Sequence, residues 1–157
     1  MNDVLMPEWM KKKHEADELA KAKEEARQQK LMTAALLIER EAPKFWKQLQ
    51  EKIAIAVEFL PKLDMTGSIT TFGSGMRVSV SCPGVFANQT YTDLFFNGEV
   101  RKIRCTTLNG GVYTLQFTVG PDDTVGVESS RDAIFMNVDQ ASEYVMRKMI
   151  EVIESRK

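Results

Sequence analysis

The spacing of apolar residues changes from a helical period to a strict alternation at about residue 60. Before that point, one apolar stripe recurs every three or four residues, which is the pattern of one helix face. After Lys62 the apolar residues alternate with polar ones, which is typical of strands. The residue before a proline is biased away from helical geometry, and Leu60 precedes Pro61. The sequence therefore predicts a helix over residues 7–60, followed by a sheet. The stripe consists of Leu31, Ala35, Ile38, Ala42, Phe45, Leu49, Ile53, Ala56 and Leu60.

Pro43 lies inside this predicted helix. A proline in a helix interior removes a hydrogen bond and kinks the helix, unless it begins a new one. Glu41 and Ala42 precede it, and neither is a good N-cap for a new helix. Because the apolar stripe keeps its phase across Pro43, we expect one kinked helix or two nearly collinear helices.

The first part of the helix differs from the rest, and we predict that residues 1–30 form a charged helical arm. Leu19 is the only large apolar side chain between residues 11 and 30, although Ala, Glu, Lys and Gln there favour helix. Such a segment has little to bury, so it is either a solvated helix or an arm that docks on a partner. A cluster of apolar residues, Met6, Trp9 and Met10, precedes this polar segment. Trp9 either anchors a partner or folds back on its own domain. The candidate protein interface comprises Met6, Trp9, Met10 and Leu19.

Residues 31–157 are predicted to form a single α+β domain. Short connections favour antiparallel pairing, and one apolar face per strand favours a sheet that is covered on one side. The strand-like runs predict a five- to six-stranded antiparallel meander, with Met76, Ile103, Tyr113 and Ile134 among its inward residues. The runs are Ser68–Phe72, Met76–Cys82, Tyr91–Asn97, Val100–Leu108, Val112–Val119, a short run at Val125–Glu128, and Ala133–Val138.

A second helix is predicted after the sheet, with Asp139 as its N-cap. Ala141, Val145 and Met149 line one side of it at helical spacing. The expected fold is therefore a long N-terminal helix, an antiparallel meander, and a C-terminal helix that packs on the same sheet face.

The outer sheet face combines aromatic and basic residues, which together can stack on bases and contact phosphates. The net charge of −1 disfavours nucleic acid, and exposed aromatic residues more often mark a protein–protein surface. Asp93, on the same face, is predicted to be a lone, solvated acid. By alternation this candidate binding face carries Phe72, Arg77, Tyr91, Phe95, Lys102, Arg104 and Phe135.

Catalytic and metal-binding patterns are missing from the sequence. His14 is the only histidine and lies in the polar arm, while Cys82 and Cys105 lie in separate strand-like runs and read as reduced core thiols. The glycine-rich run 72–75 joins two strand-like runs and opens no helix, so it predicts a hairpin turn rather than a phosphate loop. We expect no enzyme activity and no cofactor.

These observations favour a non-catalytic protein-interaction module that binds a protein partner, or a second copy of itself, through the N-terminal helix. Two alternatives stay open. One is a ligand-binding or enzymatic domain with a pocket between sheet and helices, to which Tyr113, Tyr144 and Arg147 contribute polar groups; the other is a weak single-stranded nucleic-acid binder. No apolar run approaches the roughly 20 residues of a membrane-spanning helix, and the N-terminus lacks a signal-peptide pattern. We expect a cytoplasmic protein from a bacterium or a phage-infected cell, with no membrane partner.

Overall fold

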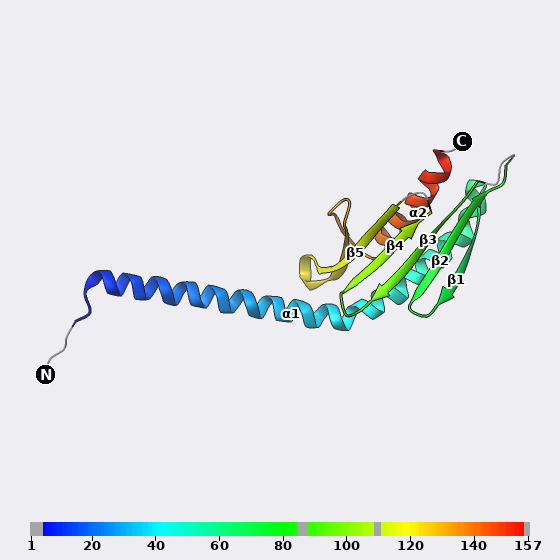
Figure 1. Cartoon of the computed structure of the whole chain (residues 1–157). Coiled ribbons are helices and arrows are strands. Elements are labelled where there is room, and N and C mark those ends of the chain that lie inside the picture. Colours follow the sequence, from blue (N-terminus) through cyan, green and yellow to red (C-terminus); the bar gives the residue numbers. More distant parts are fainter. Residues whose placement is uncertain (1–4, 85–87, 109–110, 156–157) are drawn as a thin grey trace. The chain divides into compact units, whose positions relative to one another are not determined.

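The computed structural model describes residues 5–84, 88–108 and 111–155. The chain divides into two compact units, Met1–Leu36 and Leu37–Lys157. Helix α1 (Glu8–Phe59) belongs to both units, and the sheet and the second helix follow it along the chain (Figure 1).

In the first unit, residues 8–36 of α1 form a continuous helix. Side chains three or four residues apart on a helix are neighbours, and two such ion pairs form here. Lys13 Nζ lies 3.2 Å from an Asp17 carboxylate oxygen, and Arg27 binds Glu24 at 2.7 Å. Both pairs are exposed, so water screens them and they add little to helix stability. Helix propensity and weak surface pairs hold this segment in shape.

In the second unit, α1 continues through Pro43 without a break and ends at Phe59. Of the two arrangements expected at Pro43, one helix rather than two collinear helices is therefore present. A short 3₁₀ helix, η1 (Leu60–Leu63), follows, and Asp64 then adopts a left-handed conformation that turns the chain into the sheet. Buried residues of the stripe from Ile38 onward face the core: Ile38, Ala42, Phe45, Leu49, Ile53 and Leu60, with Trp46 beside them.

The sheet is an antiparallel meander in which each strand pairs with the next one along the chain. It has seven strands within the described residues, slightly more than the five or six that we predicted. The strands are β1 (Thr66–Phe72), β2 (Gly75–Cys82), β3 (Asn88–Asn97), β4 (Lys102–Thr107), β5 (Gly111–Val119), β6 (Val125–Ser129) and β7 (Phe135–Met136), with a 3₁₀ turn, η2 (Pro121–Asp123), between β5 and β6.

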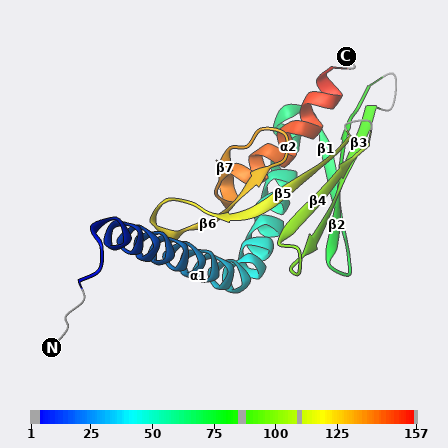
Figure 2. The ribbon, with the colours of Figure 1, turned by 60° about the vertical axis from the view of Figure 1, so that its left-hand side comes forward.

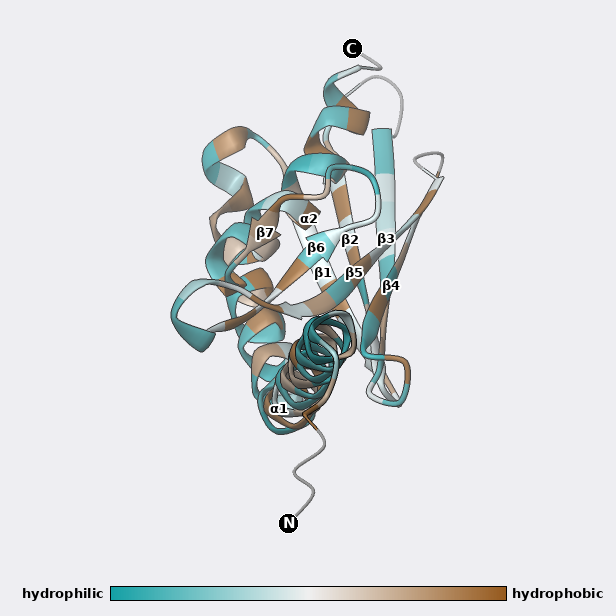
Figure 3. Ribbon diagram, turned by 90° about the vertical axis from the view of Figure 1, so that its left-hand side faces the viewer, coloured by the Kyte–Doolittle hydropathy of each residue, from teal (hydrophilic) through white to brown (hydrophobic). Residues whose placement is uncertain are grey.

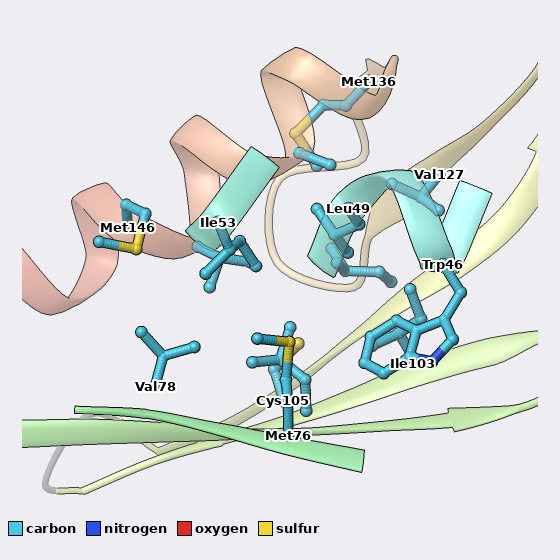
Figure 4. Packing of buried hydrophobic residues seen from close by; sticks show 14 of the residues in the cluster. Trp46, Leu49, Ile53, Met76, Val78, Ile103, Cys105, Val127, Met136 and Met146 are labelled. Atoms are coloured by element: carbon cyan, nitrogen blue, oxygen red, sulfur yellow. The ribbon is translucent and has the colours of Figure 1, made fainter. Parts of the chain in front are cut away.

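One face of the sheet is covered by helices. The C-terminal part of α1 and helix α2 (Val138–Glu154) lie on the same side of it (Figures 2 and 3). Figure 4 shows Leu49 and Ile53 of α1 above Met76 and Cys105 of the strands. Aromatic contacts extend this core, because the ring centroids of Phe45 and Phe117 lie 5.3 Å apart, and those of Trp46 and Phe96 lie 5.8 Å apart.

The N-cap of α2 is Asn137, so the prediction of Asp139 was wrong. The Asn137 side chain accepts a hydrogen bond from the Gln140 backbone at 2.8 Å, and the Gln140 side chain accepts one from the Asn137 backbone at 2.9 Å. This reciprocal capping box begins the helix two residues earlier than expected. Asp139 lies in the first turn instead and pairs with Lys52 of α1 at 3.1 Å.

The last strand is also shorter than predicted. Ala133 has a positive φ of 49°, which bends the chain before the strand begins. Ile134 is consequently 63% exposed rather than inward, and Val138 is the first residue of α2. Only Phe135 and Met136 remain to pair with β6.

The turn between β3 and β4 is wider than the tight turn that Asn97-Gly98 favours. The Asn97 side chain accepts hydrogen bonds from the backbone N–H groups of Glu99, at 3.0 Å, and Val100, at 3.4 Å. Arg101 then adopts a positive φ of 56° before β4 starts at Lys102. An Asx-type turn therefore includes Val100 and Arg101, which the alternating pattern assigned to the strand.

The capping box gives a test of the α2 boundary. Replacing Asn137 by Ala should lower the free energy of unfolding by about 1 kcal/mol, because the backbone N–H of Gln140 loses its acceptor. Asp139→Ala should cost less, about 0.5 kcal/mol, because it removes only an exposed pair and a first-turn charge. Urea unfolding of both variants measures the difference. A larger loss in Asp139→Ala would contradict Asn137 as the cap.

Candidate functional site

An aromatic pair lies on the uncovered face of the sheet. Phe72 ends β1 and Phe95 lies on β3, and both pair with Gly75, which lies between them on β2. The two ring centroids are 5.4 Å apart at an interplanar angle of 59°, and the residues are 38% and 41% exposed. A Cβ atom on Gly75 would come within 3.0 Å of both rings, so a glycine is needed for this contact.

An ion pair lies beside the aromatic pair. Arg77 donates two hydrogen bonds to the Asp93 carboxylate, at 2.7 and 2.9 Å, and its guanidinium group lies 4.1 Å from the centre of the Tyr91 ring. The hydrogen bond to Asp93 raises the pKa of Arg77. The Asp93 side chain is only 14% exposed, so the prediction of a lone, solvated acid was wrong. Its partner is 16 residues away in sequence and directly opposite in the sheet.

Phe72, Phe95, Arg77 and Asp93 line a depression of about 420 Å³ on the outer face. Two of these residues are aromatic and the other two form a neutralised ion pair, which suits an uncharged side chain better than an anion. Thr70 of β1 completes the lining, so the depression reaches the first strand of the sheet. The full lining comprises Thr70, Phe72, Arg77, Asp93 and Phe95.

The predicted outer-face residues do not form one cluster. Phe72, Arg77, Tyr91 and Phe95 lie together on β1 to β3, as just described. Arg104 and Lys102 lie on β4, opposite Phe95 and Asn97 of β3, so these two basic residues extend the same face. Phe135 lies on β7, at the other end of the strand order, where its ring packs over Gly120 and Gly126.

The residues proposed for a pocket between sheet and helices do not line this depression. The ring centroids of Tyr113 and Tyr144 lie 5.5 Å apart, and Tyr144 Oη hydrogen-bonds to Asp132, at 2.5 Å, and Ser129, at 2.8 Å. Arg147 instead pairs with Glu143 on its own helix, at 3.2 Å. Arg147 therefore has a partner of its own, whereas the two tyrosine rings pack against each other.

Tyr113 is the buried polar residue of this region. Its hydroxyl lies beside the Cys105 thiol but forms no hydrogen bond of good geometry with any described residue. Burial first, and then Cys105, raises the pKa of Tyr113 above the ordinary value. Burial likewise raises the pKa of the Cys105 thiol to about 12. Both groups are neutral and unreactive near neutral pH, because a thiol acts as a nucleophile only as the thiolate. Cys82 and Cys105 are both free cysteines.

The four residues predicted as a protein interface lie in the first unit. Met6 precedes α1, while Trp9, Met10 and Leu19 lie on it, and each is exposed by between 42% and 67%. Further large apolar side chains of this unit are equally exposed: Leu31, Met32 and Leu36. The apolar stripe places Leu31 on the buried face, which is wrong, because the unbroken spacing carries no signal that the buried part begins only near Ile38.

A scan against protein-family models, a search of curated proteins and a search of solved structures each returned no significant match to this chain. Among the residues that the structure describes, no three His, Cys, Asp or Glu side chains are grouped so that they could hold a metal ion. No described helix is both long and apolar enough to cross a membrane.

The unpaired hydroxyl of Tyr113 leads to a test by pH. Tyr113→Phe should leave the free energy of unfolding at neutral pH unchanged or raise it by up to about 1 kcal/mol, because a buried group without a partner is lost. Above pH 10 the unfolded tyrosine releases its proton while the folded one retains it, so the native chain loses stability as the pH rises. Above pH 10, the free energy of unfolding of Tyr113→Phe should therefore fall by up to about 1.4 kcal/mol less per pH unit than that of the native chain.

Tyr144→Phe is the matched control, because this hydroxyl has two hydrogen-bond partners. It should lose about 1 kcal/mol at neutral pH. Denaturant unfolding at a series of pH values measures both variants. An equal loss in the two at neutral pH would show that Tyr113 has a partner as valuable as those of Tyr144.

Proposed function

We propose that the chain is a non-catalytic protein-interaction module that binds through the N-terminal part of α1. The observation that supports this proposal is the apolar surface of the first unit. Every large apolar side chain described in this unit is at least 42% exposed, although the unit is a helix of nearly 30 residues. A helix gains most of its stability from packing an apolar face, and this segment has no core of its own.

The apolar residues gather at the two ends of the segment. Leu5, Met6, Trp9 and Met10 lie at its start, and Leu31, Met32 and Leu36 lie at its end, with Leu19 between the two groups. Trp9 is 67% exposed, and tryptophan is the residue type most often found among the few side chains that dominate an interface. The polar stretch between the two groups contains the exposed ion pairs. Such pairs keep a helix soluble but add little binding energy, so we assign partner binding to the apolar groups.

The test compares the full chain with a version that lacks residues 1–30 and with two point variants. Light scattering after size-exclusion chromatography reports self-association, and affinity capture with mass spectrometry reports a different partner. Trp9→Ala should weaken the association at least about tenfold, because burial of the indole drives binding. Gln28→Ala, an exposed change on the same helix, should leave it unchanged.

Tryptophan fluorescence gives an independent readout. Trp46 is 8% exposed and Trp9 is 67% exposed, so the difference between the native chain and Trp9→Phe isolates the signal of Trp9. On association, that signal should shift to shorter wavelength as the indole leaves water. A full chain that is strictly monomeric and captures no partner in a manner dependent on residues 1–30 would refute the proposal.

A further inference from the structure

The first strand of the sheet offers an open edge. β1 is the terminal strand and hydrogen-bonds only to β2 within the described sheet. Six of its seven residues are exposed, and only Ile69 is half-buried. The row of backbone N–H and C=O groups on its free side therefore faces solvent, which is a template for another strand.

This edge lacks the features that normally prevent strand addition. Protective edges carry charged side chains, proline or a bulge, or they are very short. β1 contains no charged residue and no proline, and its register with β2 runs without a bulge from Thr66, opposite Ser81, to Phe72, opposite Gly75. The opposite edge, β7, has only two residues and leads directly into α2.

The depression on the outer face lies beside this edge. Thr70 and Phe72 of β1 form its near side, and Arg77, Asp93 and Phe95 form the remainder. A strand added next to β1 would place every second side chain on the outer face. One long side chain beside Thr70 would then reach over β1 into the depression, which Phe72 and Phe95 line. Known sites that bind an added strand combine main-chain hydrogen bonds with pockets for alternate side chains. The β1 edge and the depression beside it have this arrangement.

The size of the edge argues against a second copy of β1 as the occupant. Seven residues at ~3.3 Å each, with a sheet spacing of ~10 Å, give a contact of roughly 230 Å² per chain. A stable dimer buries about 800 Å² per partner, so this edge has the size of a peptide site rather than a dimer interface.

Charge points to the same kind of partner. β1 carries no charge, and the two charged residues that line the depression, Arg77 and Asp93, neutralise each other. A charged side chain on the added strand would lose water without gaining a counter-ion. We infer that the β1 edge binds an extended, uncharged segment of a partner protein that inserts one aromatic side chain into the depression beside Thr70. This site lies on β1 to β3 and is independent of the first unit, which ends at Leu36.

The probe is an acetylated, amidated seven-residue peptide in which threonine alternates with valine and whose central residue is phenylalanine. A second peptide carries serine at the centre. Titration of the full ¹⁵N-labelled chain followed by NMR should shift the amide signals of residues 66–72 and those that line the depression. The phenylalanine peptide should bind at least about tenfold more tightly than the serine peptide, because an aromatic side chain is buried.

Three variants locate the site. Thr70→Lys places a charge on the edge and should weaken both peptides at least about tenfold. Phe72→Ala should abolish the preference for phenylalanine while main-chain pairing persists. Val112→Lys is the matched control, because it puts the same charge on the same face of β5, an internal strand, and should change neither affinity.

The inference is overturned if neither peptide binds at millimolar concentration, if Thr70→Lys binds as the native chain does, or if the shifts map to another surface. Dimerisation of the free chain that Thr70→Lys abolishes would assign the edge to a second copy instead. Variants of Trp9 should leave peptide binding unchanged, so failure of this inference and failure of the proposed arm are distinguishable.

Discussion

The packing of α1 on the inner face of the sheet is the contact on which the second unit depends. Leu49 and Ile53 are completely buried there, and each contributes about 1.5–3 kcal/mol by leaving water. A meander of this kind has one apolar face, which has to be covered before the sheet is stable in water. α1 covers it from the N-terminal side of the sequence and α2 from the C-terminal side, so the sheet is stable only when both ends of the domain are in place.

Most of this architecture could be predicted from the period of the apolar residues, because burial on a single face imposes that period. The helix through Pro43, the antiparallel meander and the inward positions of Met76, Ile103 and Tyr113 all follow from it. Alternation failed where backbone geometry decides instead. The positive φ of Ala133 bends the chain and exposes Ile134, and the Asn137 capping box starts α2 before Asp139.

The outer face was predictable in composition but not in arrangement. Alternation placed Phe72, Arg77, Tyr91 and Phe95 on one side, yet it could not show that Asp93 lies opposite Arg77, because that depends on the register between β2 and β3. It also grouped Phe135 with them, although the strand order puts β7 far from β3. Gly75 illustrates the limit: its sequence context predicts a hairpin turn, and its lack of a side chain is also what lets two rings meet across β2.

Exposed apolar side chains alone are weak evidence of binding, because more than half of an ordinary protein surface is apolar. The two surfaces proposed for this chain rest on different physical grounds. The arm is a helix without an apolar core, so the function proposed for it depends on side chains that still have area to bury. The β1 edge presents main-chain groups already fixed in a strand, and pairing there orders only the incoming segment. A partner that used both surfaces would gain affinity from each without any contact between them, because joining two sites on one chain raises the effective concentration at the second.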